Sequence, residues 1–580
     1  MQAWDATADL PAGGPPRMPG ALPTDLVSPV VAFLRRAHER HLANDEGTVA
    51  TYIPELGVAD PEAFGIVVAT VDGAVYEVGD TRTPFTIQSM AKPLTYATIL
   101  DIHGVDAVRD RIGVEPTGDA FNAISLSPAT GMPLNPMVNA GAITAVGMVP
   151  EGRFPGDASR TGHLLASLGR FAGRPLAVDE AVYRSERDTG HRNRAIANLL
   201  RGTGALDDDP EAVLEAYFRL CSVAVDARDL ALIAATLAAG GRHPLTGAVA
   251  AGEDTVRDVL SVMATCGMYD GAGEWLFEVG LPAKSGVSGG IFAVLPGQIG
   301  IGVWSPRLDA RGNSVRGVAV CRDLAKEFDL HLVRGVRPIG AVRTRTTVAR
   351  QPSKRGRTLP ERERLTTDAG RSLVLELQGA IGFVAVETLA REATADPEQP
   401  AAVVIDLRRA IRLDPAVTGL VADLVAGLGS RGSAVAWSGT DAHEAALERI
   451  DDALAGRRLT PPRRFVDLDL ALEWAEDVVL SRGQAVGTRP EQRFVPLVRH
   501  PAMAGLGTEA AERFHAILER RTFRPGDALV RQGEPAEELF LVTGGRLSVW
   551  VQVGAGEARR LATLEAGGLV GELAFLGREQ

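Results

Sequence analysis

Two residues that could act as nucleophile and base stand three positions apart in the segment Ser89-Met90-Ala91-Lys92. Residues with this spacing share one face of a helix, so the hydroxyl and the amine would lie close together. Pro93 follows directly, and proline is tolerated only in the first helical turn, so we expect a helix to begin close to Ser89. The positive end of the helix dipole would stabilise a developing alkoxide, and a desolvated Lys92 amine could accept the hydroxyl proton.

A second motif, far downstream, strengthens this interpretation, because Ser-x-x-Lys alone occurs by chance in many long chains. Lys284-Ser285-Gly286 is followed by Val287-Ser288-Gly289-Gly290 and enters a predicted strand. The glycines allow backbone N–H groups to approach a substrate closely, as an oxyanion hole requires. The two motifs together resemble the layout of β-lactamases and penicillin-binding proteins. The third element of that layout, Ser-Asp-Asn, is absent, which argues against a true β-lactamase or peptidase.

Several longer blocks between residues 26 and 329 resemble the serine-dependent glutaminase family, which shares the β-lactamase-like α/β fold. Blocks that agree in order and spacing are far more specific than one short motif. The blocks are Tyr52-Ile53-Pro54-Glu55-Leu56, Gln88-Ser89-Met90-Ala91-Lys92-Pro93-Leu94, Asn135-Pro136-Met137-Val138-Asn139-Ala140-Gly141-Ala142, Ser185-Glu186 with Thr189-Gly190-His191-Arg192-Asn193, Cys266-Gly267-Met268-Tyr269-Asp270, and Leu281-Pro282-Ala283-Lys284-Ser285.

The resemblance implies hydrolysis of L-glutamine to L-glutamate and ammonia, with Ser89 as nucleophile and Lys92 as base. Tyr269 and Tyr52 are candidates to relay the proton to the departing ammonia. The backbone N–H groups of Ser89 and Val287 would form the oxyanion hole. The family's substrate-binding positions match Gln88, Ser89, Asn139, Glu186, Asn193, Tyr217, Tyr269 and Val287. The resemblance also implies a homo-oligomer.

These residue types suit free glutamine, which carries an α-ammonium and an α-carboxylate. A buried Glu186 would bind the ammonium, and Asn and Tyr donors would bind the carboxylate. Taken alone, Tyr217 could be an ordinary core aromatic residue of a helix, and Asn139 could belong to a turn. Two other functions remain open: another Ser–Lys amidase or esterase of β-lactamase-like fold, and a scaffold that uses an inactive fold of this type.

The elements expected to position these residues form one large α/β domain over residues 24–340. Phe64–Val71 reads as a strand that ends at the turn Asp72-Gly73. Gly290–Leu295 and Ile299–Trp304 are separated by Pro296-Gly297, which predicts a β-hairpin.

Composition limits the remaining possibilities. A formal net charge of −12 argues against a nucleic-acid partner, because phosphate binding needs an excess of Lys and Arg. Three cysteines in 580 residues form neither a disulfide framework nor a metal-ligand pattern, which favours the cytoplasm. We find no membrane-length apolar segment, and we expect no metal or other cofactor.

The rest of the chain divides by composition. Residues 1–23 are rich in Pro, Gly and Ala, and are expected to be a disordered leader. Residues 341–366 carry eight Lys and Arg with few apolar residues, and are expected to be a solvated basic linker. A small α/β domain is expected over 367–480, a second linker over 481–504, and a last domain over 505–580.

The 367–480 segment resembles a STAS domain. The similarity lies in Leu373–Ala380, Val403–Leu407 and Leu413-Asp414-Pro415-Ala416. STAS domains of the antagonist type are switched by phosphorylation of a Ser after the Asp, and Pro415 occupies that place. The resemblance implies a module that binds a protein partner or another copy of the chain.

The 505–580 segment resembles the start of a cyclic-nucleotide-binding β-roll. The similarity lies in Phe523–Asp527, Arg531–Glu534, Leu539–Val542, Gly544–Leu547 and Gly568–Ala574. Gly571-Glu572-Leu573-Ala574 matches the opening of the family's phosphate cassette, and the sequence ends shortly afterwards, at Gln580. We therefore expect a partial β-roll that does not bind cyclic AMP or cyclic GMP tightly.

Overall fold

The computed structural model describes residues 28–118, 124–151, 159–332, 340–357, 359–368, 371–396, 398–481, 494–534, 538–552 and 558–571. The predicted leader, 1–23, lies outside these residues. The chain divides into two compact units. The first contains the residues up to 339, with two short later pieces, Gly382–Glu387 and Pro415–Asp423.

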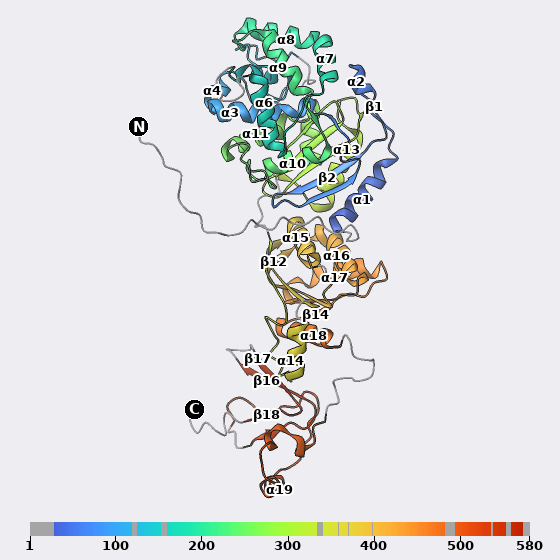
Figure 1. Cartoon of the computed structure of the whole chain (residues 1–580), viewed down its shortest axis with the longest axis vertical. Helices are drawn as coiled ribbons and strands as arrows, with labels where there is room; N and C mark the ends of the chain where they lie inside the picture. The colour runs from blue at the N-terminus through green and yellow to red at the C-terminus, as the bar shows by residue number, and fades with distance from the viewer. Residues whose placement is uncertain are drawn as a thin grey trace, which may run out of the picture. The chain divides into compact units, whose positions relative to one another are not determined.

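A five-stranded antiparallel sheet forms the framework of the first unit (Figure 1). Its strands lie in the order β3 (Val75–Gly79), β2 (Gly65–Thr70), β8 (Ile299–Trp304), β7 (Gly290–Leu295) and β6 (Ala283–Ser285). The predicted strand over 64–71 corresponds to β2. The predicted hairpin is confirmed as β7 and β8, with Gly290 opposite Trp304 and Leu295 opposite Ile299.

Helix α10 (Ala227–Ala238) packs against β2, β7 and β8, and α1 (Pro29–Leu42) and α13 (Val315–Phe328) pack against strands of the same sheet and against each other. Two glycines of β8 allow α10 to lie unusually close. A Cβ on Gly300 would come within 2.1 Å of the Ala235 nitrogen, and one on Gly302 within 2.4 Å of the Ala227 oxygen. The alternating Ile-Gly-Ile-Gly pattern therefore lets the helix backbone contact the strand backbone.

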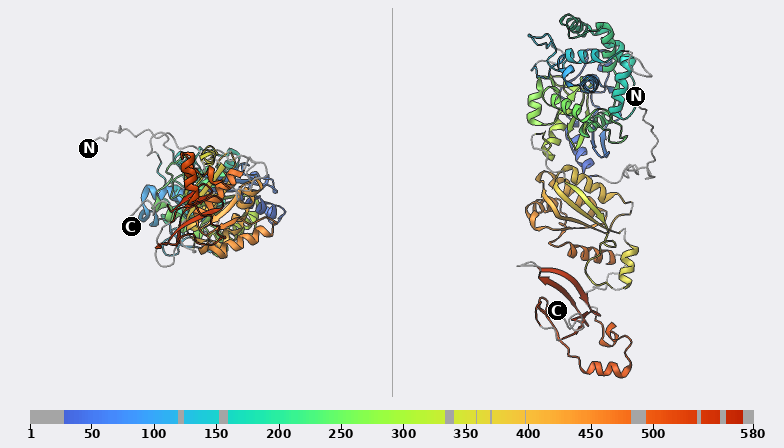
Figure 2. Two further views of the ribbon diagram at one scale, coloured as in Figure 1. Left: turned by 90° about the horizontal axis from the view of Figure 1, so that it is seen from below. Right: turned by 90° about the vertical axis from the view of Figure 1, so that its left-hand side faces the viewer.

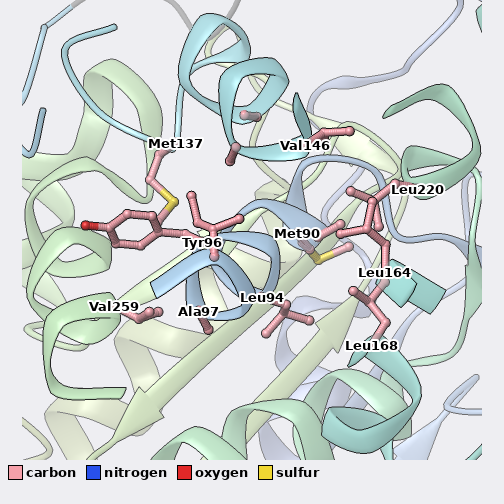
Figure 3. Close-up of a cluster of buried hydrophobic side chains, with 14 of the residues drawn as sticks. Met90, Leu94, Tyr96, Ala97, Met137, Val146, Leu164, Leu168, Leu220 and Val259 are labelled. Atoms are coloured by element: carbon pink, nitrogen blue, oxygen red, sulfur yellow. The ribbon is translucent and has the colours of Figure 1, made fainter. Parts of the chain in front are cut away.

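A second layer consists of helices packed around α3 (Lys92–His103). Every residue of α3 from Lys92 to Leu100 is buried, so this part of the helix has no solvent-facing side. Figure 3 shows Leu94, Tyr96 and Ala97 of α3 among side chains of the surrounding helices. Those helices are α5 (Asn139–Met148), α6 (Arg160–Ala172), α9 (Pro210–Cys221) and α11 (Glu253–Cys266). The central helix thus places Lys92 deep inside the domain.

The remaining elements of the first unit are shorter or peripheral. They are β1 (Thr48–Val49), α2 (Pro54–Gly57), β4 (Phe85–Thr86), α4 (Val105–Arg109), α7 (Glu180–Thr189), α8 (His191–Thr203), β5 (Ala224–Val225), α12 (Ala272–Glu278) and β9 (Arg307–Leu308).

The second unit contains another five-stranded sheet, whose strands are drawn in yellow to orange in the right-hand view of Figure 2. The order is β10 (Ala341–Thr346), β11 (Ser372–Ile381), β12 (Ala402–Leu413), β13 (Ala434–Ser438) and β14 (Arg463–Phe465). β10 is antiparallel to β11, and the other neighbours are parallel. The helices are α14 (Leu359–Thr367), α15 (Phe383–Thr394), α16 (Thr418–Ser430), α17 (Glu444–Ala455) and α18 (Leu468–Ser481). α18 packs across β12, β13 and β14 and contributes Ala471, Leu472, Ala475 and Val479 to the core.

The expectation of a solvated linker over 341–366 is wrong. The segment contains β10, which pairs with β11, and α14, which packs on α18. Arg355 and Arg357 are only 7% and 8% exposed. Composition alone predicted solvation because it does not reveal the acidic partners that lie far along the chain.

The final part of the second unit is small and rich in turns. Its described elements are α19 (Thr508–Ala516), β15 (Phe540–Leu541), β16 (Arg546–Gln552), β17 (Ala558–Glu565) and β18 (Leu569–Val570). β16 and β17 form an antiparallel hairpin, and β15 pairs with β18. Of the predicted linker 481–504, residues 482–493 lie outside the described chain, and 3-10 turns cover Leu497–Arg499 and Pro501–Met503.

Candidate active site

Ser89 lies in a 3-10 turn, Gln88–Ala91, between β4 and α3, and is only 7% exposed. The preceding residue, Gln88, has a φ of 50°, in a left-handed region that non-glycine residues seldom adopt. The Gln88 side chain donates to Thr86 Oγ1 at 3.2 Å and to Glu186 Oε1 at 3.3 Å, and accepts from the Tyr52 hydroxyl at 3.3 Å. These bonds hold a strained turn in place, as is common at active sites.

Lys92 begins α3 and is 2% exposed. Its Nζ donates to Asn139 Oδ1 at 2.7 Å and to the Met137 carbonyl at 3.2 Å. Burial lowers the pKa of Lys92 to about 8. Within the described chain Lys92 has no hydrogen bond to Ser89, although such catalytic bonds often form only when substrate is bound. The amine is therefore desolvated, and a larger share of it is neutral near physiological pH than for an ordinary lysine.

The Tyr269 side chain lies next to Ser89. It forms a hydrogen bond with Ser89 and donates its hydroxyl proton to the Ser285 carbonyl at 2.9 Å. Tyr269 also has a positive φ, of 55°. Burial raises the pKa of Tyr269 to about 12, so the phenol is protonated at neutral pH and is suited to donating a proton.

Lys284, from β6, is fully buried beside Tyr269. Its Nζ lies 3.9 Å from the centroid of the Tyr269 ring and donates to the Ser285 carbonyl at 2.8 Å. Burial lowers the pKa of Lys284 well below its usual value, and Lys92 lowers it further. The downstream motif therefore lies next to the Ser89 turn in space.

The turn between β6 and β7 lies against the Ser89 turn. A Cβ on Gly286 would come within 3.1 Å of the Ile87 oxygen, and one on Gly290 within 2.4 Å of Met90 Cε. Among the residues that the structure describes, neither the Ser89 nor the Val287 N–H has a hydrogen-bond acceptor. Two backbone N–H groups that lack acceptors and lie on neighbouring turns are suited to form an oxyanion hole.

A carboxylate and two tyrosines complete this side of the site. Glu186, on α7, is 7% exposed, and burial raises its pKa. Its Oε1 accepts from the Tyr52 hydroxyl at 2.8 Å, although Tyr52 is 52% exposed as a whole residue. Tyr217, on α9, is 4% exposed; burial raises its pKa well above the usual value, and the nearby Glu186 adds to that effect.

Asn139 links this site to Asn193. Its Oδ1 accepts from Lys92, and its Nδ2 donates to Asn193 Oδ1 at 2.9 Å. Asn139 begins α5 and Asn193 lies in the first turn of α8, so the first turns of two helices position these side chains.

The structure thus brings together all the residues selected from the sequence. Sequence reasoning missed the contact between Asn139 and Lys92 and the role of the Ser285 carbonyl, because neither is encoded in local spacing.

A surface pocket of about 400 Å³ lies beside this cluster rather than on Ser89. It is lined by Thr48–Tyr52, Asp270 and Leu308–Gly312. Tyr52 belongs both to the pocket and to the Glu186 cluster, and Asp270 follows Tyr269 in the chain.

In the described part of the chain there is no group of His, Cys, Asp or Glu side chains that could hold a metal ion. No described helix is long and apolar enough to span a membrane.

Two family models match separate parts of this chain. The family model "Glutaminase" matches residues 47–333, and the family model "Cyclic nucleotide-binding domain" matches residues 520–580. Glutaminase 1 of Bradyrhizobium diazoefficiens is 42% identical over 94% of this chain and 87% of its own length. A glutaminase of Trichormus variabilis is 49% identical over 53% of this chain and 92% of its own length.

Two solved structures are also similar to this chain. A structure described as the probable glutaminase YbaS is 37% identical, with a TM-score of 0.51, covering 53% of this chain and 99% of its own. A structure of a protein called Mglu is 38% identical, with a TM-score of 0.51, covering 70% of this chain and 98% of its own. With the Ser89 site, these matches show that the chain belongs to the glutaminase family and carries a cyclic nucleotide-binding domain at its C-terminal end.

Proposed function

We propose that this glutaminase hydrolyses L-glutamine to L-glutamate and ammonia through an acyl-enzyme on Ser89. The Ser89 Oγ attacks the side-chain amide carbon, and the Ser89 and Val287 N–H groups stabilise the oxyanion. Lys92 takes the Ser89 proton during this attack. Collapse of the tetrahedral intermediate breaks the C–N bond, and Tyr269 relays that proton from Lys92 to the departing ammonia. Water then hydrolyses the glutamyl ester and restores the Ser89 hydroxyl.

The observation that carries this proposal is the environment of Lys92. A neutral amine has two N–H bonds and one lone pair. Asn139 Oδ1 and the Met137 carbonyl accept two hydrogen bonds from Nζ, so the lone pair of the neutral amine is left to accept the Ser89 proton. A pKa of about 8 means that a substantial share of the amine is neutral near physiological pH.

For substrate recognition we propose that Glu186 binds the α-ammonium of glutamine. Both described hydrogen bonds to this carboxylate end on Oε1, which leaves Oε2 for the ligand. Asn193 and Tyr217 would donate to the α-carboxylate, with Asn139, Gln88 and Tyr52 closing the site. This arrangement would discriminate against substrates that lack either charged group, because buried polar groups would lose their partners.

Ammonia release from L-glutamine, L-asparagine and D-glutamine tests the proposal. We expect rapid release from L-glutamine, and release at least about 100-fold slower from the other two amides, since a misplaced amide carbon cannot reach Ser89. Turnover of nitrocefin or a p-nitrophenyl ester, with none of L-glutamine, would instead indicate another Ser–Lys hydrolase. No turnover of any of these would indicate a scaffold.

For the second unit we propose a STAS-like module over 367–480 that binds a protein partner or another copy of the chain. The support is the sheet of four parallel strands within this range, with helices between the strands; β10, which precedes the range, adds an antiparallel edge strand. We also propose that the protein is cytoplasmic and forms a homo-oligomer. Light scattering of the purified chain would test the oligomeric state.

The expectation that the chain does not bind cyclic nucleotides tightly rests on residues 572–580, which lie outside the described chain.

A further inference from the structure

Residues 353–357, which we call the basic strap, connect two parts of the second unit. The strap has the sequence Ser-Lys-Arg-Gly-Arg and follows β10 in the chain. Its backbone pairs with β17: Gly356 N donates to the Thr563 carbonyl at 2.9 Å, and Thr563 N donates to the Lys354 carbonyl at 3.1 Å. The strap thus forms one parallel β-bridge with β17, between Arg355 and Thr563, beside the β16–β17 hairpin.

The same strap is bound by acidic residues of α18. Glu476 accepts from both the Ser353 N and its Oγ at 2.7 Å, and from Arg357 Nε at 2.8 Å. Asp477 accepts from Arg355 Nη1 at 2.9 Å and from Arg357 Nη1 at 2.7 Å. Both arginines and Glu476 are buried, so the bonds to Glu476 are largely removed from solvent screening, whereas Asp477 is 40% exposed and its ion pairs are screened more strongly.

The hairpin contacts the same helix directly through Arg560. This side chain is 4% exposed, and it donates to Asp469 Oδ2 at 2.7 Å and to Glu473 Oε2 at 2.6 Å. Arg546 donates to Glu473 at 3.1 Å from the opposite strand of the hairpin. Lys354 Nζ donates to the Arg560 carbonyl at 2.6 Å, so the basic strap also contacts the hairpin through a side chain.

The charges of this network balance. The acidic residues of α18 are Asp469, Glu473, Glu476 and Asp477, and Glu565 of β17 pairs with Arg355. The basic residues are Lys354, Arg355, Arg357, Arg546 and Arg560. Buried charges persist only when paired, and removal of one member leaves its partners uncompensated.

We propose that the acidic face of α18 is the docking surface of the β16–β17 hairpin and that the basic strap couples the two. The cyclic nucleotide-binding domain and the preceding five-stranded domain are then one cooperative body. Displacement of the hairpin exposes the charges of α18, and disruption of the strap on α18 loosens the hairpin.

Hydrogen exchange of the full chain, read by mass spectrometry, tests this coupling. Arg560→Gln should accelerate exchange on the order of 100-fold in peptides from the hairpin, from the basic strap and from α18, because it leaves buried carboxylates without partners. Arg520→Gln is the matched control, since Arg520 is an exposed arginine of the same domain. It should leave exchange unchanged.

Glu476→Gln gives the sharper test, because Glu476 bonds the strap and has no described bond to the hairpin. Coupling predicts faster exchange at Thr563, whose N–H is bonded to the strap. Unchanged glutaminase activity would show that the catalytic unit of each variant is folded, and an unchanged circular dichroism spectrum would show that its secondary structure is retained. If Glu476→Gln speeds exchange in the strap and α18 but leaves β17 at the wild-type rate, the proposal is wrong. The same conclusion follows if Arg560→Gln affects the hairpin alone.

Discussion

Replacement of Asn139 by aspartate should change the pH dependence of the reaction through Lys92. Asn139 Oδ1 lies 2.7 Å from Lys92 Nζ, so Asn139→Asp keeps the acceptor and adds a negative charge beside the amine. The second carboxylate oxygen would face Asn193. The side-chain amide of Asn193 can rotate by about 180°, so that its NH₂ group donates to this oxygen in place of the present bond, in which Asn193 Oδ1 accepts. The substitution therefore alters charge with little change in shape.

The size of the effect follows from the proximity of the two groups. An opposite charge at such close range raises the pKa of an amine by about 1–3 units. The pKa of Lys92, about 8 in the native site, should thus rise to roughly 9–11. At about pH 7.5 the neutral fraction would fall from roughly a quarter to between about 3% and 0.03%, so kcat should fall by about 10-fold to 1,000-fold.

The assay is kcat for ammonia release from saturating L-glutamine, measured across the rising limb of the pH profile. For Asn139→Asp the limb should move to higher pH, and the lost activity should return as the amine is deprotonated. Asn193→Asp is the control: its charge faces Asn139 rather than Lys92, so the limb should move less. A kcat that falls equally at every pH, with the limb in its original position, would refute the role of Lys92 as the base.

Other substitutions test separate parts of the site and the fold. Lys92→Ala should lower kcat by several orders of magnitude without a comparable change in melting temperature; a loss below about tenfold would contradict the assignment. Glu186→Gln should raise KM for L-glutamine by at least roughly tenfold in steady-state assays, since it removes the charge partner of the α-ammonium; an unchanged KM would make Glu186 structural. Gly141→Ala should inactivate the enzyme, because its Cβ would lie 2.0 Å from the Asn135 oxygen and displace the start of α5; a fully active variant would refute this. Arg316→Met should lower the free energy of unfolding by about 2–4 kcal/mol in urea titrations, because fully buried Arg316 donates to several carbonyl groups; an unchanged midpoint would contradict it.

Much of the catalytic domain follows from local sequence signals. Alternation and turn residues predicted the β7–β8 hairpin, and Pro93 placed the helix start within a few residues of its position at Lys92. The paired motifs around Ser89 and Lys284 predicted their proximity, which the structure shows. These features depend on short-range stereochemistry that a single chain segment encodes.

Features that depend on distant partners were not predictable in the same way. The basic residues of 341–366 suggested solvation, yet Arg355 and Arg357 are buried against acidic residues of α18 more than 100 positions later. The contact between Lys92 and Asn139, which shapes the proposed base, also joins two helices that no local pattern links.

The central claim, that Ser89 is the nucleophile of a glutaminase, is tested most directly by Ser89→Ala. Ammonia release from L-glutamine should be compared among the wild type, this variant and Ser288→Ala, which removes a different buried serine hydroxyl close to the same site. We expect Ser89→Ala to lose activity by roughly 1,000-fold or more with an unchanged melting temperature, and Ser288→Ala to retain most of it. If Ser89→Ala kept most of the wild-type rate, Ser89 would not be the nucleophile and the acyl-enzyme mechanism would be wrong.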